Sequence, residues 1–327
     1  MLEPNWAAAA VVWQLTELQG LLPVFEPASP EARALSELLF WVSILCAAIL
    51  LLVGVLIVDA VIRYRGREGD LDPPAKTASY KVEIAWTAAP VVLLAIIFGF
   101  TLRTMGLVNP DPPRNATPEV VIRGHQWWWE ATYPASGVVT ANEIHIPVGR
   151  MVLARIESAD VVHDFWAANL ARKIDMIPGR ENFVWLQADT AGTYLGRCAE
   201  YCGTQHAHMH FLVIAQEDST FAAWQASQLE RPAAPSGTLA TQGLAIFSEK
   251  ACLSCHSFGG TGGNAAPDLT HLASRRTIAA ATLTNTPANL ARWLRNPGAI
   301  KPGATMPNFQ LHDGEIAALV AYLSGLR

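Results

Sequence analysis

Charged side chains are missing from two long stretches of the 327-residue chain. None occurs at residues 38–58, and none at residues 84–102. At 1.5 Å per residue, helices of these lengths would measure about 31 and about 28 Å, enough to cross the hydrocarbon core of a bilayer. One apolar helix can be a buried core helix, but two uncharged stretches of this length in succession argue against that interpretation. The sequence therefore predicts a membrane hairpin.

Lysine and arginine are frequent between these two stretches and few immediately before and after them. The connector holds five basic residues: Arg63, Arg65, Arg67, Lys76 and Lys81. Only Arg33 precedes the first stretch, and only Arg103 and Arg114 closely follow the second. Because basic residues favour the cytoplasmic side, we expect the connector in the cytoplasm and both termini outside. No basic segment precedes an apolar patch at 7–13, so a normal signal peptide is not expected.

The sequence also lacks internal repeats and low-complexity tracts. After residue 119 short β-type runs alternate with Gly, Pro and Asn turns, a pattern typical of a β-sandwich or barrel. These runs are 120–122, 127–132, 137–140, 143–147, 151–156, 182–186, 192–195 and 210–215. Apolar residues at helical spacing predict helices at 221–229, 239–250, 287–295 and 314–326. Before the last helix, Glu315 follows His312 by three residues, a capping-box spacing with an atypical first residue.

These patterns divide the chain into five parts. They are an external N-terminal tail at 1–34, a transmembrane helical hairpin at 35–103, a β-domain at 104–231, a linker at 232–237 and a helical domain at 238–327. The linker is rich in proline and spans at most about 20 Å. It is therefore short enough to keep the last two domains close together.

Only five cysteines are present, and four of them form two close pairs. The fifth, Cys46, lies in the first uncharged stretch, where a small apolar role is expected. Because both pairs are predicted to lie in an oxidising compartment, a disulfide within each pair is one interpretation. The residues that flank the pairs favour metal binding instead.

The first cysteine pair belongs to a dense group of soft metal ligands. Cys198, Cys202, His206 and Met209 lie close together in one loop, and His163 lies upstream. Thiolates, imidazoles and a thioether are the donors that copper favours. Zinc prefers tighter cysteine spacing and seldom uses methionine. A disulfide would leave the spacing of the histidine and the methionine unexplained, so the sequence predicts a copper site.

This loop, with the spacing C-x-E-x-C-x-x-x-H-x-x-M, resembles the CuA motif of cytochrome c oxidase subunit II. The resemblance covers about residues 35–225 and implies an all-β cupredoxin-like sandwich after the hairpin. The implied site comprises His163, Cys198, Glu200, Cys202, His206 and Met209. In the family the two cysteines bridge two coppers. Glu200 would give its backbone carbonyl to copper and its carboxylate to a magnesium ion shared with subunit I.

Two other segments resemble the same family. The run Gly-His-Gln-Trp-Trp-Trp-Glu implies that Trp127 is the surface residue through which electrons arrive, although the family usually has Tyr where Trp128 stands. On a strand, Trp127 and Trp129 would share one face and Trp128 would take the other. Near the start of the second uncharged stretch, Glu83 is either a solvated helix end or, as the resemblance implies, a mouth for proton uptake. Four other histidines are expected to be surface or structural residues: His125, His145, His208 and His210.

The second cysteine pair forms Cys252-Leu-Ser-Cys255-His256, the attachment motif of a c-type haem. In this motif the thiols add to the haem vinyl groups and the histidine binds iron. The sixth iron ligand is expected to be Met306, in a segment that resembles the Met loop of class I cytochromes c. His271 is the competing ligand, but it lies close behind the attachment site. Residues 238–327 thus resemble a complete small all-α class I cytochrome c domain.

A subunit II fused to a cytochrome c domain resembles the caa-type oxidases of bacteria. The resemblance implies a plasma-membrane subunit that takes electrons from cytochrome c or a similar donor and relays them through haem c and the binuclear CuA centre. The recipient would be the haem–copper subunit I, which reduces oxygen and pumps protons, so activity is expected only in the complex. Other membrane subunits are expected partners, and nucleic acid is not. Two alternatives are a nitric oxide reductase subunit and a free-standing membrane electron carrier; Glu83 and Glu200 favour the oxidase, because each has a purpose only beside subunit I.

The two exported domains have opposite net charges. Residues 104–235 contain 9 basic and 14 acidic residues, a net −5, and residues 236–327 contain 7 basic and 4 acidic residues, a net +3. Opposite charges on tethered domains predict electrostatic docking. The basic residues of the last domain are Lys250, Arg275, Arg276, Arg292, Arg295, Lys301 and Arg327. Electron transfer between the domains is therefore expected to slow at high salt, and on reversal of Arg292 and Arg295 to glutamate.

Overall fold

The structure is a computed structural model. It describes residues 23–66, 69, 79–108, 110, 112 and 116–327. The apolar patch at 7–13, the connector residues Arg67 and Lys76, and Arg114 lie outside the described residues. The described part of the chain begins with a short 3-10 helix, η1 (Pro23–Phe25).

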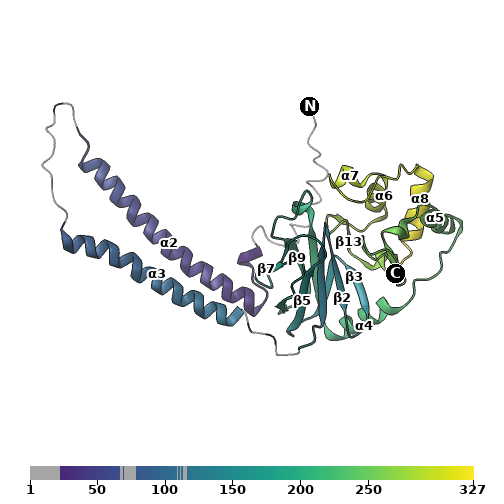
Figure 1. Ribbon diagram of the computed structural model, residues 1–327, viewed down its shortest axis with the longest axis horizontal. Coiled ribbons are helices and arrows are strands. Elements are labelled where there is room, and N and C mark those ends of the chain that lie inside the picture. The colour runs from purple at the N-terminus through teal and green to yellow at the C-terminus, as the bar shows by residue number, and fades with distance from the viewer. Residues whose placement is uncertain (1–22, 67–68, 70–78, 109, 111, 113–115) are drawn as a thin grey trace. The chain divides into compact units, whose positions relative to one another are not determined.

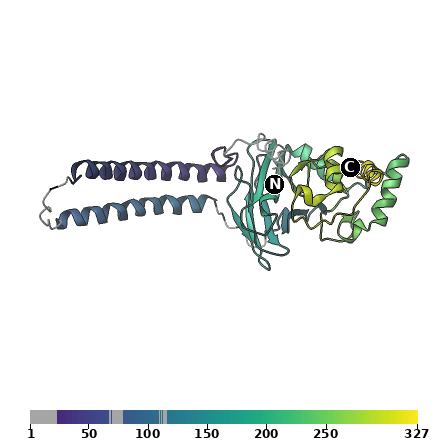
Figure 2. The same ribbon diagram turned by 90° about the horizontal axis from the view of Figure 1, so that it is seen from above.

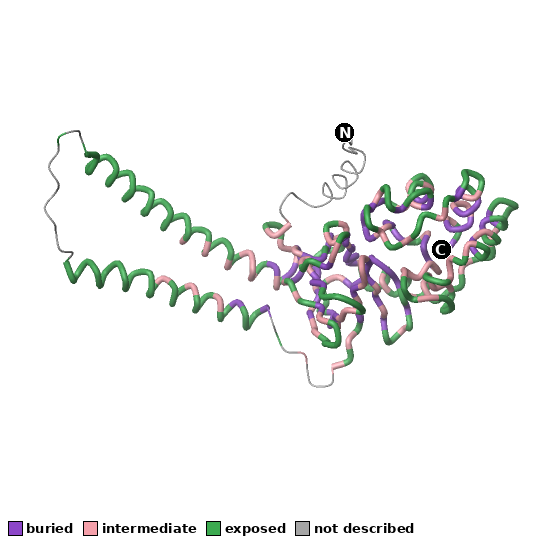
Figure 3. Tube along the Cα trace, turned by 45° about the horizontal axis from the view of Figure 1, so that its top comes forward, coloured by how far each residue is buried: buried purple, intermediate pink, exposed green. Residues whose placement is uncertain are grey.

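Residues 33–111 form one compact unit, which contains two long apolar helices. They are α2 (Pro30–Arg63) and α3 (Tyr80–Val108), which run in opposite directions (Figures 1 and 2). Most of their residues are exposed, as the green trace in Figure 3 shows, and Leu50 exposes 75% of its surface. Apolar surface of this extent is unfavourable in water and favourable in lipid. Each helix contains its predicted uncharged stretch and is long and apolar enough to cross a membrane.

The residues at the start of α2 explain where that helix begins. The Ser29 hydroxyl accepts a hydrogen bond from the backbone N–H of Ala32 at 2.9 Å, and Pro30 occupies the first helical position. A serine cap followed by proline is a common helix start, because proline has no N–H to leave unpaired. Inside α3, Pro90 interrupts the hydrogen-bond ladder but not the helix, as membrane helices tolerate.

The β-domain contains two five-stranded sheets. The first has the order β3-β2-β1-β5-β8, with bounds Val138–Ala141, Trp128–Tyr133, Val120–His125, Val152–Ser158 and Asn182–Leu186. The second has the order β4-β10-β9-β6-β7, with bounds Glu143–Pro147, His210–Gln216, Gly192–Cys198, His163–Trp166 and Ile174–Met176. Neighbouring strands are antiparallel except for β1 with β5 and β4 with β10. Two layers of mainly antiparallel strands form the predicted cupredoxin-like sandwich.

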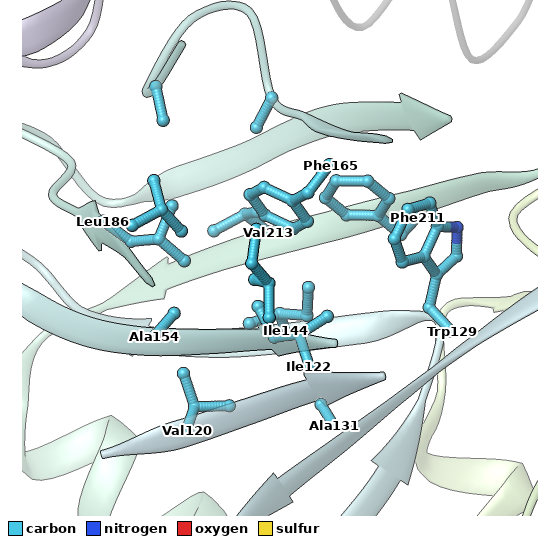
Figure 4. Packing of buried hydrophobic residues seen from close by; sticks show 14 of the residues in the cluster. Val120, Ile122, Trp129, Ala131, Ile144, Ala154, Phe165, Leu186, Phe211 and Val213 are labelled. Atoms are coloured by element: carbon cyan, nitrogen blue, oxygen red, sulfur yellow. The ribbon is translucent and has the colours of Figure 1, made fainter. Parts of the chain in front are cut away.

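The core of this sandwich is packed from the inward-facing residues of both sheets. Figure 4 shows Trp129, Phe165 and Phe211 close together within it. The ring centroid of Phe211 lies 4.8 Å from that of Trp129 and 4.6 Å from that of Phe165. Gly196 on β9 makes room for this cluster, since a Cβ atom there would collide with the Phe211 ring. The cluster supports the end of β9 from which Cys198 emerges.

Helix α4 (Asp218–Leu229) follows the sandwich and precedes the C-terminal domain. The α-helices of the C-terminal domain are α5 (Thr238–Glu249), α6 (Pro287–Arg295), α7 (Pro297–Ile300) and α8 (Asp313–Leu323). Two short hairpins are formed by β11 (Ser257–Phe258) with β12 (Thr261–Gly262), and by β13 (Thr277–Ile278) with β14 (Leu283–Thr284). The short 3-10 helices are η2 (His206–His208), η3 (Cys252–Ser254) and η4 (Leu272–Ser274). Helices α5 and α8 pack closely at Gly243, where any Cβ atom would collide with the carbonyl of Ala318.

The start of α8 uses the capping box that its sequence spacing suggested. The Nδ1 atom of His312 accepts a hydrogen bond from the backbone N–H of Glu315 at 3.2 Å. The Glu315 carboxylate accepts one from the backbone N–H of His312 at 3.0 Å. Histidine therefore performs here the role that serine or threonine usually performs.

The β-domain and the C-terminal domain belong to one compact unit and contact each other directly. Glu143 at the start of β4 accepts hydrogen bonds from the backbone N–H groups of Arg276 and Thr277, at 2.7 and 2.9 Å. In the other direction, Lys301 of the C-terminal domain donates to the carbonyl of His208 at 3.1 Å. Each domain thus places a buried charged side chain against the backbone of the other.

Two of the arginines that were expected to dock the domains do not serve that purpose. The Arg295 guanidinium pairs with Asp313 at 2.7 Å, and Arg292 donates to Asn289 at 3.2 Å, both within the C-terminal domain. The structure therefore does not place Arg292 and Arg295 at the contact between the domains, and we no longer expect docking through them. Net charge counts residues but does not locate them, whereas a contact depends on the few residues at the interface.

Candidate functional site

The predicted copper ligands lie at one end of the sandwich. His163 begins β6, Cys198 ends β9, and the loop that follows carries Cys202, His206 and Met209 before β10 begins. Strands β6 and β9 are hydrogen-bonded neighbours, so the upstream histidine is placed beside the loop. The sandwich thereby brings together residues that are far apart in the sequence.

The donor atoms of these residues converge. The Sγ atoms of Cys198 and Cys202 are 3.7 Å apart, and both cysteines are free thiols. His163 Nδ1 lies 3.9 Å from Cys198 Sγ, and the Nδ1 of His206 lies 3.6 Å from Cys202 Sγ. Met209 Sδ lies 3.7 Å from Cys202 Sγ. Two thiols flanked by two imidazoles and a thioether are a soft donor set that suits copper.

Glu200 contributes its backbone to the same loop. Its carbonyl oxygen lies 3.1 Å from Cys198 Sγ, at the cluster, while its side chain is exposed. The carbonyl is therefore placed where it could complete a copper site. The carboxylate remains available to a group outside this chain.

His163 is held in place by three residues, none of which the spacing of the motif had indicated. Asp160 Oδ1 lies 2.8 Å from His163 Nε2, so the ring directs Nδ1 toward the cysteines. This is the usual arrangement by which a carboxylate orients a metal-binding imidazole. Gly124 leaves space for the ring, since a Cβ atom there would lie 2.8 Å from His163 Cδ2. The backbone N–H of Gln126 donates to Asp160 at 2.7 Å and fixes that carboxylate in turn.

The electrostatics of the cluster favour a thiolate. The hydrogen bond with Cys202 is the main cause that lowers the pKa of Cys198 well below its ordinary value, and the hydrogen bond with His163 lowers it further. Burial alone would lower the pKa of His163, but its hydrogen bonds with Cys198 and Asp160 outweigh burial and raise that pKa. A thiolate beside hydrogen-bonded imidazole is prepared to bind a soft cation.

A second site lies in the C-terminal domain, around a cavity of about 270 Å³. Its lining includes all four residues predicted to hold a haem: Cys252, Cys255, His256 and Met306. Most of the other lining side chains are apolar, among them Phe247, Leu294 and Phe309. His271, the competing ligand, is buried elsewhere and does not line the cavity. The geometry therefore favours Met306 over His271.

The side chain of His256 is prepared for iron. Its Nδ1 lies 2.7 Å from the carbonyl of Pro267, so Nδ1 carries the proton and Nε2 is left with its lone pair. Burial lowers the pKa of His256, which keeps the imidazole neutral. A neutral imidazole with one nitrogen free is the form that binds a metal.

Arg275 supplies a test of whether this cavity fits a haem. The residue is 8% exposed and lines the cavity, and its Nη2 donates to the carbonyl of Asp268 at 2.7 Å. Its Nε has no hydrogen-bond partner among the described residues. Burial lowers the pKa of Arg275, which shows that the charge is costly where it lies. The carboxylates of a haem would provide the missing acceptor, so the residues fit the group.

Trp127 lies between the two sites. Its indole Nε1 donates to the carbonyl of Cys202 at 2.9 Å, and the residue also lines the cavity of the C-terminal domain. The resemblance implied a surface position, but Trp127 is half-buried. On β2, Trp129 packs in the main core and Trp128 packs on a separate cluster, as strand alternation predicts. Trp127 packs against the main core as well, but it lies in the turn before β2 and not on the predicted strand.

The side chains of the remaining predicted residues are not among the proposed ligands of either site. Glu83 is exposed in the first turn of α3. His145 stacks on Trp224, and His125 stacks on Trp128 with ring centroids 4.1 Å apart. His208 lies in the copper loop, where its carbonyl faces Lys301, and its ring is not part of the thiol cluster.

Three family models match successive parts of the chain. "Cytochrome C oxidase subunit II, transmembrane domain" matches residues 13–103, and "Cytochrome C oxidase subunit II, periplasmic domain" matches residues 135–216. "Cytochrome c" matches residues 240–327. Together they cover both apolar helices, much of the sandwich and nearly all of the C-terminal domain.

Individual relatives have the same description. Cytochrome c oxidase subunit 2 of Alkalihalophilus pseudofirmus is 34% identical over 312 residues, which are 94% of this chain and 91% of that one. The Bacillus subtilis protein of the same description is 33% identical over 289 residues, 82% of this chain and 81% of that one. Among solved structures, the periplasmic domain of subunit II of cytochrome oxidase from Bradyrhizobium japonicum is 30% identical, covers 35% of this chain and 95% of that chain, and has a TM-score of 0.33.

The family accounts for both sites that the structure displays. The periplasmic-domain model corresponds to the sandwich with the His/Cys/Cys cluster, and the cytochrome c model corresponds to the domain with the cavity beside the Cys-x-x-Cys-His motif. The two apolar helices agree with a two-pass membrane protein. The chain therefore belongs to the cytochrome c oxidase subunit II family, as a member with a C-terminal cytochrome c domain, and is a subunit of a haem–copper oxidoreductase complex.

Proposed function

We propose that this chain accepts electrons from cytochrome c or a similar donor and delivers them to subunit I of a terminal oxidase. Subunit I then reduces oxygen and pumps protons. A covalent haem and a two-copper centre supply reversible one-electron chemistry when they are bound. The chain provides the two sites and the contact between them.

In the C-terminal domain the proposed haem ligands divide by role. The thiols of Cys252 and Cys255 would form the thioether links, and His256 would bind iron through Nε2. Met306 would be the other iron ligand, and a thioether ligand raises the reduction potential. The hydrogen bond from His256 to Pro267 holds the imidazole in one orientation throughout.

In the copper loop the proposed ligands surround the two thiols. The thiols of Cys198 and Cys202 would hold the copper centre together with His163, His206, Met209 and the carbonyl of Glu200. Sharing one electron over two bridged metals spreads the change in charge, so the ligands and solvent reorganise little. The core cluster behind β9 and the Asp160 carboxylate hold the donors in place before any metal binds.

One observation carries the proposal of an internal relay. The Trp127 indole lines the cavity of the C-terminal domain and is hydrogen-bonded to the carbonyl of Cys202 in the copper loop. A single side chain therefore bridges the two proposed redox sites. Trp127 would receive electrons from the chain's own C-terminal domain rather than from an external donor.

Two carboxylates are proposed to serve the assembled complex. The exposed side chain of Glu200 would bind magnesium at the boundary with subunit I, while its carbonyl faces the thiols. Glu83, at the start of α3, would form a mouth for proton uptake. Both roles require a cytoplasmic connector, with the copper and haem domains on the periplasmic side. The basic residues in the connector favour this orientation.

The test is to isolate the chain from membranes of its host in mild detergent through a tag on this chain. A haem–copper subunit I should co-purify, and the preparation should consume oxygen when reduced cytochrome c is added. In a flash-induced electron-transfer experiment, Trp127→Phe should slow the transfer from haem to copper. The control Trp166→Phe should not slow it, because Trp166 does not line the cavity. Isolation without a partner would instead identify a free electron carrier, and reduction of nitric oxide rather than oxygen would identify a different oxidoreductase.

A further inference from the structure

Trp128 is a β-domain residue that forms part of the wall of the C-terminal cavity. It is the first residue of β2 and is 6% exposed. It packs in one buried cluster with Ala141 of its own domain and Ala280 of the C-terminal domain. The cavity that is proposed to hold the haem is thus completed by a side chain from the neighbouring domain.

The indole of Trp128 has an unused hydrogen-bond donor. Its Nε1 is buried and has no partner among the residues that the structure describes. The ring is held by stacking on His125, with an interplanar angle of 9°. Buried donors in native proteins almost always have an acceptor, so an indole N–H beside a ligand cavity points to an acceptor on the ligand.

The same cavity is lined by two buried cations, Arg275 and Lys301. Lys301 is 4% exposed and donates from Nζ to the carbonyls of His208 and Ala279, at 3.1 and 3.3 Å. Neither cation lies within ion-pair distance of a carboxylate in the described ranges, although the Asp268 and Glu143 carboxylates act on the Arg275 charge from further away. The Glu143 carboxylate accepts its hydrogen bonds from the backbone of Arg276 and Thr277 and from the Thr277 hydroxyl. Because buried charges are normally paired, we expect an anionic group to bind in this part of the cavity.

We propose that Trp128 contacts the haem and donates its indole N–H to one of the haem propionates, beside Arg275. The proposal rests on the proposed function, because it takes the cavity as the haem site. A haem carries two propionate carboxylates, which are the acceptors and the negative charge that this region lacks. The haem then binds a surface made by both domains, and its electrostatic environment depends on their contact.

The experiment uses the full chain with covalent haem and bound copper in detergent. The haem midpoint potential is measured from about pH 5 to 9 for the unmodified chain, Trp128→Phe and the control Trp166→Phe. Trp166 lies on β6, is partly buried with Lys173 over its ring, and does not line the cavity. The copper signal and the haem absorption of each variant show that it is folded and loaded.

Loss of the donor should make the ionised propionate less stable. We expect its pKa in Trp128→Phe to rise by about one unit, a tenfold change in the acid dissociation constant. The potential at neutral pH should shift to more negative values, because the propionate charge is less compensated and favours the oxidised haem. Arg275 and Lys301, which line the same cavity as Trp128, are the same in all variants. Burial lowers the pKa of His125, which stacks on Trp128, to about 4, below the measured range.

The outcomes separate hydrogen bonding from packing. Trp128→Tyr, which restores a donor on an aromatic ring, should recover at least part of the shift. If Trp128→Phe matches the unmodified chain, or if the Phe and Tyr variants shift alike, the hydrogen bond does not exist and the proposal is overturned. An equal shift in Trp166→Phe overturns it as well. A chain isolated with no covalent haem would overturn the proposed function itself, a result that the haem absorption reveals before any potential is measured.

Discussion

Glu143 provides the sharpest test of how the two exported domains are joined. The side chain is 2% exposed and accepts three hydrogen bonds from the C-terminal domain. They come from the backbone N–H groups of Arg276 and Thr277 and from the hydroxyl of Thr277, the last at 3.1 Å. Glu143→Ala removes the acceptor and leaves all three donors at a buried interface.

The expected loss follows from those three donors. Leaving one buried donor unsatisfied costs roughly 1–3 kcal/mol, so three cost about 3 kcal/mol or more. That is at least about a hundredfold in the ratio of docked to undocked chains, since 1.4 kcal/mol is a factor of ten. Glu143→Gln keeps an amide oxygen as acceptor and should lose much less.

Amide hydrogen exchange measures this effect without depending on either cofactor. The N–H groups of Arg276 and Thr277 should be protected in the unmodified chain and should exchange about a hundred times faster in Glu143→Ala. The amides of α8, which belong to the core of the C-terminal domain, serve as the control for unfolding. If these two amides remain as protected in Glu143→Ala as in the unmodified chain while α8 is unchanged, Glu143 does not hold the interface.

The pH dependence of the same amides has a defined sign. Burial raises the pKa of Glu143 and outweighs the opposing effects of the Thr277 and Arg276 hydrogen bonds and of the Arg275 charge. A group whose pKa is raised in the docked state contributes stability below its ordinary pKa and loses it as pH rises through the raised value. Protection, corrected for the intrinsic exchange rate, should therefore fall above the ordinary carboxyl range. Glu143→Gln should remove this dependence, and an unchanged profile in that variant would show that another group is responsible.

Three further predictions address the two redox sites and the route between them. Cys202→Ser should abolish the two-copper electron paramagnetic signal and leave the haem spectrum intact; a retained signal refutes the copper assignment. Met306→Ala should lower the haem potential and remove the thioether-to-iron absorption, and an unchanged spectrum would transfer the ligand role to His271. Reversal of Arg292 and Arg295 to glutamate should leave the rate of haem-to-copper transfer unchanged, because both contact only their own domain; a slower rate would revive electrostatic docking through them.

The sequence predicted the sandwich well where strands alternate clearly. The predicted bounds of β4 and β8 agree with the structure, because their apolar residues and flanking turn residues mark both ends. Strands β6 and β7 were not predicted as separate runs. Each is short, and each carries a central aspartate, Asp164 or Asp175, which lie opposite one another in the pairing register. Their strand conformation comes from neighbours in the sheet and not from local propensity.

The ligand set could be predicted because metal chemistry fixes residue type and spacing. The supporting residues could not, because their roles depend on spatial neighbours. Asp160 precedes His163 by three residues, a hint that the sequence does contain, but only the fold shows that its carboxylate reaches Nε2. Trp128 was noted as a departure from the usual tyrosine, yet its position against Ala280 depends on how two domains pack.

The opposite net charges of the two domains and their buried contacts act at different stages of docking. Exposed charges guide an encounter, and salt screens them once the Debye length falls below about 10 Å. A short linker makes that encounter frequent even without guidance. The seated state depends instead on Glu143 and Lys301, which are buried, and buried charges are screened much less. The rate of haem-to-copper transfer should therefore respond little to salt between about 10 and 300 mM, because the charges that decide the seated state are those that salt reaches least.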